Sequence, residues 1–420
     1  MRKSKISCLI LLLLFICFVL AGCGSKQDSS VEITMIHGWG STGEDHIIMR
    51  EIYEGFEKEH PEIHVNLISM PSSEDVVNKV GDLLTVGKIP DIIFAGGEGK
   101  ENIYRFMVEK NYAVDLMPYI EKDDELARSV SPFILDTWKT DNGNLYTVSD
   151  VLLMCGYWYN KEIFREAEIE GIPTTWEQWY QMCEKIEKLN KKRDTSVKVM
   201  VLDTNHVAYL TTVLIFHEGI DEVGDIKSRK LDVNSGTFKY VLSNLEKMSQ
   251  YARVETDYNY LDTLYSFNAG ETAVYINGVW ASEMIKEDLP VAYAAFPSDD
   301  GSGVATRSAC VGYILGNTGD EKRMAASVEF LKYMLSDTVA EKILKSTGQV
   351  PSNPNVKLTD ENSSERMKQA VISVERAGIL VETPENLWDS YKKENYEKEI
   401  ILFLKGQISE EKLKEKMSKL

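Results

Sequence analysis

The sequence predicts an α/β protein with two domains. Strand and helix patterns alternate along the N-terminal part of the chain, which is typical of a parallel sheet covered by helices on both faces. The 420 residues exceed what one hydrophobic core usually serves, so two domains are expected. No Pro/Ser-rich tract or internal repeat divides the chain. That absence favours domains interleaved by several crossings of the backbone.

The alternation of strands and helices begins at residue 31. Apolar side chains alternate in two stretches, as in half-buried strands, and recur at helical spacing between them. These side chains are Val31, Ile33 and Met35 in the first strand, Ile48, Ile52 and Phe56 in the helix, and Ile63, Val65 and Leu67 in the second strand. After another helical stretch, residues 90–95 (PDIIFA) form a buried strand. The order is therefore β-α-β-α-β.

Two loops follow strands of this predicted parallel sheet. In such sheets ligands bind beyond the carboxyl ends of the strands. Residues 37–41 (HGWGS) and 96–99 (GGEG) occupy that position. They are therefore the first places where a binding site is expected.

Helix signals continue in the later part of the chain. Residues 173–177 (PTTWE) offer threonine as an N-cap with an acid in the first turn. Met324, Val328, Leu331 and Leu335 mark one apolar helix face. From Gln407 the chain has the pattern of a charged amphipathic helix, whose charges form a solvated face.

The first 23 residues have the order of a secretory signal. Basic residues precede an apolar stretch, which ends in Leu-Ala-Gly and Cys23. The stretch is short for a bilayer span, which needs about 20 residues. The ending looks like a bacterial lipobox, in which the thiol carries diacylglycerol; ordinary cleavage beside an incidental cysteine is the alternative. We expect residues 1–23 to be a lipoprotein signal, which is cleaved before Cys23 so that this cysteine carries the lipid. Residues 24–30 would form a tether.

The charge balance argues against nucleic acid as a partner. The formal net charge is −19, and removal of the signal takes away three more positive charges. Nucleic-acid binders present a basic patch, whereas an acidic surface repels phosphate.

The cysteines and histidines predict no disulfide framework, metal site or cofactor. Cys155, Cys183 and Cys310 would remain in the mature chain, an odd and sparse set without metal-site spacing. They are expected to be buried thiols. His60 and His64 are separated by Pro61, which breaks the helix that could align them.

Several motifs, in their order and spacing, resemble the family 1 extracellular solute-binding proteins, the maltose-binding-protein-like group. The resemblance covers nearly the whole mature chain. The motifs are residues 56–61 (FEKEHP), 91–94 (DIIF), 142–146 (NGNLY), 158–161 (WYNK), 173–177 (PTTWE) and, most specific, 269–280 (AGETAVYINGVW).

The resemblance implies a two-lobed, periplasmic-binding-protein-like fold of the class II type. A cleft lies between lobes joined by hinge crossings, and the lobes close on ligand. Residues 31–150 and 291–345 would form the N-terminal lobe, and 151–290 and 346–420 the C-terminal lobe. Where many relatives have a proline in the crossover, this chain has Ser149, which leaves the hinge geometry open.

Four aromatic residues are candidate ligand contacts. Sugars present apolar C–H faces and a rim of hydroxyls, so a sugar site needs flat aromatic platforms with polar groups at their edges. The resemblance places Trp280, Trp388 and Tyr209 at the cleft, and Trp39 lies between glycines in the first exit loop. Each tryptophan could instead pack a strand end or anchor its own loop.

Four polar residues complete the candidate site. Glu98 lies where relatives often place an acid that accepts hydrogen bonds from sugar hydroxyls, and an ionised carboxylate is acceptor-only. His37 could donate or accept at the same rim. Asp150 and Arg307 are weaker candidates, because either could form a structural ion pair.

The resemblance implies a monomeric, lipid-anchored protein on the extracellular face of a bacterial membrane. It would capture a sugar or oligosaccharide and deliver it to the permease subunits of an ABC importer. A non-sugar solute is one alternative, although the exit loops are short of the basic residues that an anion would need. A hydrolase with Glu98 and Asp150 as its two carboxylates is the other, but no common catalytic motif is present. A role beside a non-transport receptor is also compatible with this scaffold.

Overall fold

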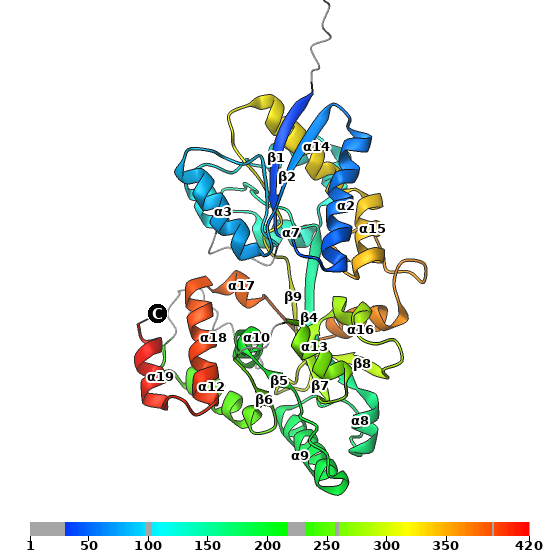
Figure 1. Ribbon diagram of the computed structural model, residues 1–420, viewed down its shortest axis with the longest axis vertical. Coiled ribbons are helices and arrows are strands. Elements are labelled where there is room, and N and C mark those ends of the chain that lie inside the picture. The colour runs from blue at the N-terminus through cyan, green and yellow to red at the C-terminus, as the bar shows by residue number, and fades with distance from the viewer. Residues whose placement is uncertain (1–29, 97–102, 217–231, 257–259, 389, 420) are drawn as a thin grey trace, which may run out of the picture.

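The computed structural model consists of two lobes stacked along the long axis of the molecule (Figure 1). It describes residues 30–96, 103–216, 232–256, 260–388 and 390–419. The predicted two-lobed α/β fold is confirmed. Within the described residues, no helix combines the length and apolarity that a bilayer crossing needs.

The first lobe is built on a four-stranded sheet. Its strand order is β10-β3-β1-β2, with β1 (Val31–His37) parallel to β2 (Ile63–Ser69) and β3 (Ile92–Phe94), and β10 (Tyr313–Leu315) antiparallel at the edge. The three parallel strands enter from the far end of the lobe, so that their carboxyl ends point toward the second lobe (Figure 1). The helices of this lobe are α2 (Glu44–Glu59), α3 (Ser73–Thr85), α4 (Arg105–Glu109), α5 (Met117–Ile120), α6 (Asp124–Ser129), α7 (Pro132–Trp138), α14 (Glu321–Leu335) and α15 (Asp337–Thr347).

The local sequence explains where these helices begin and which face they bury. Ser72 caps α3 by accepting a hydrogen bond from the backbone N–H of Asp75 at 3.1 Å. Helix α2 buries Ile52 and Phe56, two of the three residues expected on its apolar face, and Phe330 of α14 packs edge-on against Phe56. The apolar periodicity therefore identified the helix faces that form the core of this lobe.

The second lobe is built on a six-stranded sheet centred on β4 (Val151–Asn160). The first half of β4 pairs with β11 (Val350–Pro351) and β9 (Val304–Ser308), and its second half pairs with β7 (Val274–Gly278) and β8 (Val291–Ala294). Strand β12 (Ile379–Val381) adds to β9 in parallel, and β5 (Val201–Leu202) forms a separate pair with β6 (Arg253–Val254).

Helices surround this second sheet. Thr175 caps the long helix α9 by accepting a hydrogen bond from the backbone of Gln178 at 3.3 Å, as the sequence predicted. The helices of the lobe are α8 (Lys161–Glu166), α9 (Trp176–Arg193), α10 (Thr204–Phe216), α12 (Gly236–Ser249), α13 (Tyr260–Asn268), η2 (Val279–Glu283), α16 (Glu365–Glu375), α17 (Pro384–Leu387), α18 (Ser390–Leu404) and α19 (Glu410–Met417).

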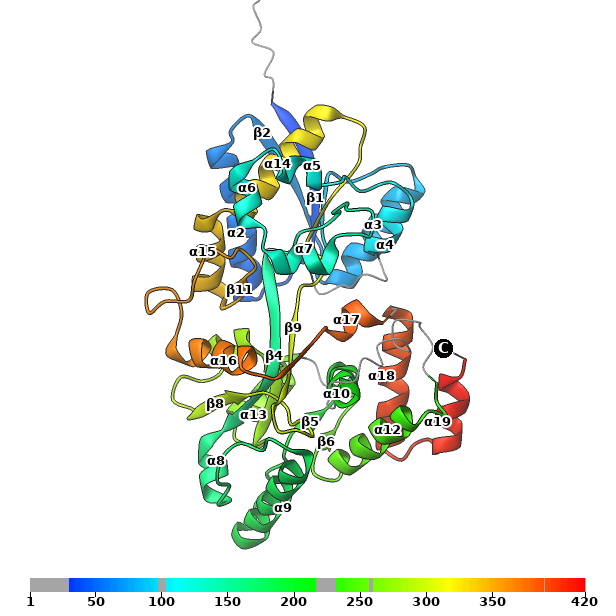
Figure 2. The ribbon, with the colours of Figure 1, turned by 180° about the vertical axis from the view of Figure 1, so that it is seen from behind.

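The backbone crosses between the lobes along β4 and β9, which run side by side in both views (Figures 1 and 2). Just before β4, Val148 forms a bridge with Tyr313 of the first sheet. The hydroxyl of Ser149, at the departure from the family pattern, donates to the carbonyl of Val151 at 2.8 Å. Its own carbonyl accepts from the hydroxyl of Ser352. Ser149 is thus held by the segments that meet at the crossing.

The return crossing lies later than the expected boundary at residue 291. Strands β8 and β9 both pair with β4 in the second sheet, and the chain enters the first core only from Ala309 onward. The strand pairs that decide this boundary join distant segments of the chain, so their partners are not visible in the local pattern.

Candidate functional site

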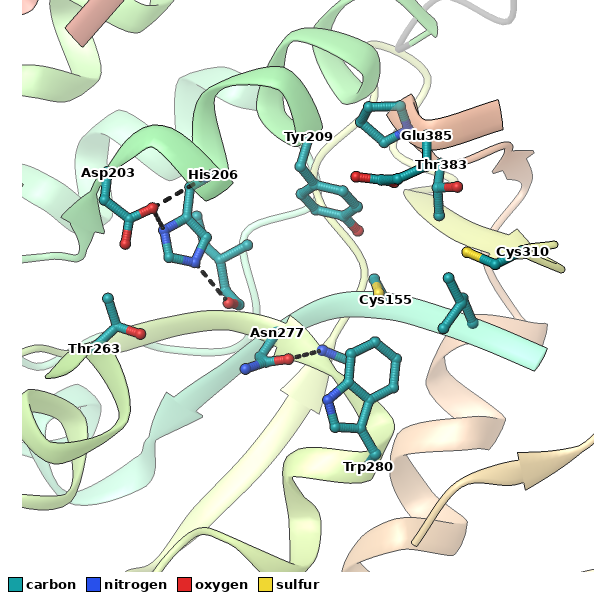
Figure 3. Close-up of a pocket in the computed structure, with 14 residues that line it drawn as sticks. Cys155, Asp203, His206, Tyr209, Thr263, Asn277, Trp280, Cys310, Thr383 and Glu385 are labelled. Atoms are coloured by element: carbon teal, nitrogen blue, oxygen red, sulfur yellow. Dashed lines mark hydrogen bonds and ion pairs between the residues drawn. The ribbon is translucent and has the colours of Figure 1, made fainter. Parts of the chain in front are cut away.

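A cavity of about 370 Å³ opens on the second lobe, beside the two crossing segments (Figure 3). Residues from both crossings form part of its wall, Leu153 and Cys155 from β4 and Cys310 from the segment after β9. The rest of the lining comes from the second lobe: Asp203, His206, Tyr209, Thr263, Ile276, Asn277, Gly278, Trp280, Thr383, Pro384 and Glu385. The cavity therefore lies where the lobes meet.

A larger hollow, of about 490 Å³, is a weaker candidate. It lies on the first lobe near Asn317, which follows the carboxyl end of β10. This end of β10 pairs with the amino end of β3, so the hollow lies far from the second lobe. Its carboxylate, Asp115, already accepts hydrogen bonds from the backbone of Met117 and Leu145 and from the amide of Asn144. The hollow beside the crossings offers more to a ligand.

Two aromatic residues lie on opposite sides of the cavity (Figure 3). Trp280, in η2 directly after β7, is half-buried, so part of its ring stays open to the cavity. The ring lies so close over Gly278 that a Cβ there would overlap it. Tyr209 of α10 packs edge-on against Phe296 at 5.8 Å between ring centroids. The sequence predicted both residues as ligand contacts, and the structure brings them to one cavity.

A charged pair lies at one end of the cavity. His206 Nδ1 is 2.8 Å from Asp203 Oδ1, and its Nε2 is 3.1 Å from the carbonyl oxygen of Ile276. Burial by itself lowers the pKa of His206, but the charge and hydrogen bond of Asp203 and the Ile276 carbonyl raise it above its ordinary value. When the ring is protonated it can donate to both partners, and its charge then balances that of Asp203.

A second charged group lies at the other side of the cavity. Glu385, at the start of α17, lines the wall, and Lys393 of α18 lies 3.6 Å from its carboxylate. The same ammonium is 3.0 Å from Glu397. Burial raises the pKa of Glu397 to about 7, although Lys393 opposes the shift. One lysine is thus shared between two carboxylates.

Trp388 is not among the described residues that line the cavity. Trp388 is buried in the core of the second lobe, where it packs edge-on against Tyr396 at 4.7 Å between centroids. Residues 383–385, just before it, do line the cavity. Glu98 lies outside the described residues.

His37 and Trp39 lie at the carboxyl end of β1 in the first lobe. His37 is fully buried: its Nδ1 accepts from the backbone of Trp39 at 3.1 Å, and its Nε2 is 3.1 Å from the hydroxyl of Ser69. Burial, with the charges of Arg50 and His46, lowers the pKa of His37 to about 4. Both ring nitrogens are engaged, which differs from the expected ligand contact. Trp39 is half-buried and stacks on Phe94.

Asp150 and Arg307 lie at the crossings but do not line the cavity. Asp150 is buried and accepts a hydrogen bond from the hydroxyl of Tyr313 at 2.9 Å. Arg307 pairs with Met154, between the cavity-lining positions 153 and 155 of β4, so its side chain lies on the opposite face of the sheet. There the guanidinium lies 4.9 Å from the ring of Phe133 in α7. Both residues therefore have structural partners between the lobes.

Asp203, His206 and Glu385 were missed by the sequence reasoning. Asp203 and His206 follow β5 at the start of α10, the position where ligands bind in α/β folds. Strand β5 has only two residues, too few for an alternating pattern. Glu385 stands three positions before Trp388 in a segment that was considered only for its aromatic residue. The proline at the first turn of α17 marks a helix start and was the available signal.

Asp150 predicts a pH dependence of stability. Burial raises the pKa of Asp150 from 3.8 to about 6, although the Tyr313 hydrogen bond opposes the shift. The native state therefore keeps a proton that the unfolded chain releases, and this contribution, present below pH 4, is lost as the pH rises through about 6. As the pH rises through this range, the free energy of unfolding of Asp150→Asn should therefore fall by about 1 to 3 kcal/mol less than that of the wild type. Urea unfolding of both proteins from pH 3.5 to 7.5 measures it, and parallel curves would refute it.

The fold and the cavity are those of a two-lobed binding protein, with the candidate site beside the crossing segments. A family model, the bacterial extracellular solute-binding proteins, matches residues 51–369. The chain belongs to this family, as the sequence motifs indicated.

Known relatives extend along nearly the whole chain. The chain is 22% identical to the multiple sugar-binding protein of Streptococcus mutans, over 82% of this chain and 81% of the relative. A Streptococcus pneumoniae solute-binding protein, solved in complex with the blood group A-trisaccharide, has a TM-score of 0.74 at 24% identity, covering 92% of this chain and 98% of that one. A chitin oligosaccharide binding protein has a TM-score of 0.75 at 19% identity, covering 92% and 97%. At these identities the structures show the shared fold.

Proposed function

We propose that the protein is the saccharide-binding subunit of an ABC importer. It captures a sugar or oligosaccharide in the cavity beside the crossings and delivers it to the permease. The observation that carries the proposal is the half-buried indole of Trp280 at a cavity whose other walls hold polar groups. The names of the relatives support it, since they bind sugars, a trisaccharide and chitin oligosaccharides.

The chemistry of the cavity suits a saccharide. The indole offers a flat apolar face to the C–H groups of a sugar ring, and Tyr209 closes the opposite side. Asn277, Thr263 and the Glu385 carboxylate supply donors and acceptors at the edges of that space. A sugar ring needs this combination of apolar faces and hydroxyl partners.

The first lobe supplies the other half of the site when the lobes close. The carboxyl ends of β1 and β3 point toward the second lobe (Figure 1), and ligands of parallel sheets bind beyond such ends. Trp39 from the first loop and Glu98 from the second are the proposed contacts. Hinge bending at the crossings near Ser149 brings them onto the ligand.

Closure predicts a more compact molecule in the presence of ligand. The radius of gyration from small-angle scattering should fall when a saccharide that binds is added, because the cleft narrows. Trp280→Ala at the same saccharide concentration is the control and should show less compaction, because it binds the saccharide more weakly. An unchanged radius of gyration with the site saturated would refute the hinge closure while leaving binding intact.

A ligand panel tests the saccharide proposal. Mono- and oligosaccharides are compared with phosphate, iron and peptides in thermal unfolding. A ligand at one hundred times its dissociation constant adds about 2.7 kcal/mol to the stability of the folded protein. We expect saccharides alone to raise the melting temperature. Stabilisation by phosphate, iron or peptides instead would favour a non-sugar solute.

A hydrolytic role is not proposed. The two carboxylates that line the described cavity, Asp203 and Glu385, are each paired with a cationic side chain, and the related proteins are binding proteins by name. Within the described residues, no group of three or more His, Cys, Asp or Glu side chains could hold a metal ion. Turnover of an oligosaccharide that Glu98→Gln abolishes would overturn this choice.

The same proposal places the protein on the extracellular face of the membrane as a monomer. Cys23 carries the lipid and residues 24–30 form the tether; Cys23 and residues 24–29 lie outside the described residues. Intact-mass spectrometry of membrane-extracted protein should show acyl chains on Cys23, and a mass without them would refute the anchor.

A further inference from the structure

The charges around the cavity limit which saccharides can enter it. Apart from one tyrosine and two thiols, the ionisable side chains among the described lining residues are Asp203, His206 and Glu385. These lining residues include neither lysine nor arginine. The charge of Asp203 is balanced when His206, 2.8 Å away, is protonated. Glu385 therefore decides the sign of the potential inside the cavity.

Lys393 does not neutralise Glu385 fully. Its ammonium lies closer to Glu397, at 3.0 Å, than to Glu385, at 3.6 Å. The three groups sum to one negative charge when all are ionised, which is the state above neutral pH because burial raises the pKa of Glu397 to about 7. Lys393 thus holds the Glu385 carboxylate at the wall and leaves it negative.

The other groups near this wall do not compensate. Glu382, two residues before the cavity-lining Pro384, is a further carboxylate, which accepts hydrogen bonds at 2.7 Å from Ser308 and from Asn386. Arg307, on β9, lies on the opposite face of the sheet. A sugar carboxylate in the cavity would therefore face negative charge on the α17 side without a basic partner.

Resting on the proposed saccharide binding, we infer that the cavity admits neutral and amino saccharides and excludes carboxylated ones, with Glu385 as the excluding residue and Lys393 as its positioning residue. The Glu385 oxygens accept hydrogen bonds from sugar hydroxyl or ammonium groups, whereas they can only repel a uronate. Two like charges about 5 Å apart near a protein surface repel strongly enough to weaken binding at least tenfold.

The test compares neutral, amino and acidic saccharides of similar length by calorimetric titration. The neutral probes are raffinose, maltotriose and chitotriose, the amino probe is a glucosamine trimer, and the acidic probe is trigalacturonate. Wild type should bind at least one neutral or amino probe at least tenfold more tightly than trigalacturonate. The ratio of the affinity for that probe to the affinity for trigalacturonate should fall at least tenfold in Glu385→Gln, because the amide keeps the shape of the side chain and removes its charge.

Two further variants separate the local charge from long-range effects and from misfolding. Glu394→Gln removes an exposed charge from the same helix as Lys393 and should leave the ratio unchanged. Lys393→Gln combined with Glu397→Gln removes the shared pair without leaving a buried charge unpaired. This double variant should keep the selectivity against trigalacturonate. Its affinity for neutral saccharides should fall severalfold, since Lys393 no longer positions Glu385.

Different results would overturn the exclusion by Glu385 and the proposed saccharide binding. Tight binding of trigalacturonate by wild type, or an equal effect of Glu394→Gln and Glu385→Gln on the ratio, overturns the exclusion by Glu385 and leaves saccharide binding standing. If none of the five probes binds while phosphate, iron or a peptide does, saccharide capture itself fails and the selectivity fails with it.

Discussion

Trp280→Ala is expected to lower the affinity for saccharide by one to two orders of magnitude. The indole is the largest flat surface of the cavity, and truncation of a buried aromatic contact commonly costs about 2 kcal/mol or more, where 1.4 kcal/mol is tenfold. Because Trp280 is half-buried at the wall of the cavity, its loss should leave the fold intact. Calorimetric titration measures the affinity, and circular dichroism checks the fold.

Gly278 provides an independent way to disturb the same ring. A Cβ at this position would overlap the six-membered ring of Trp280, so Gly278→Ala must displace the indole. We expect a loss of affinity approaching that of Trp280→Ala. When Gly278→Ala is added to Trp280→Ala, it should lower the affinity for saccharide little further, because the ring that it displaces is already gone. Fully additive losses would show that Trp280 does not act through its present position.

Gly312→Ala is expected to have the largest effect on stability. Gly312 lies in the return crossing, and a Cβ there would overlap the backbone carbonyl of Val148 and the Cα of Ser149. These are backbone atoms of the segment leading into β4, so no side-chain rotation can relieve the overlap. Overpacking usually costs about 1 to 3 kcal/mol and sometimes more, and we expect the upper end of that range. The shift of the urea midpoint measures it.

Gly81→Ala is the matched control for this substitution. Gly81 lies in α3 of the same lobe, and no neighbouring atom lies within 4 Å of the position that its Cβ would take. Alanine should be neutral there or raise stability by about 0.5 to 1 kcal/mol, since glycine is costly inside a helix. Equal urea midpoints for the two variants would contradict the tight contact between the crossings.

The first lobe could be predicted from sequence in more detail than the second. Its strands β1 and β2 carry a clear apolar alternation, and each pairs with a neighbour nearby in the chain. In the second lobe, β4 collects partners from residues 274, 291, 304 and 350 onward. Such pairing depends on the whole fold, so the lobe boundary at residue 291, which was carried over from the family resemblance, lies earlier than the return of the chain to the first core.

The candidate site shows the same division. Trp280 and Tyr209 could be identified because the family resemblance places both at the cleft, and both line the cavity. The same resemblance places Trp388 there, yet Tyr396 of α18 packs against it in the core. His37 became a buried residue because Ser69 and the Trp39 backbone satisfy its ring. These outcomes depend on contacts between distant residues.

A crystal structure with the saccharide that binds most tightly is the most direct test of the account. We predict a sugar ring stacked on Trp280 inside the cavity beside the crossings, with hydroxyl groups near Glu385 and the first-lobe loops closed over it. A saccharide bound on another surface, with this cavity unoccupied, would contradict the central claim.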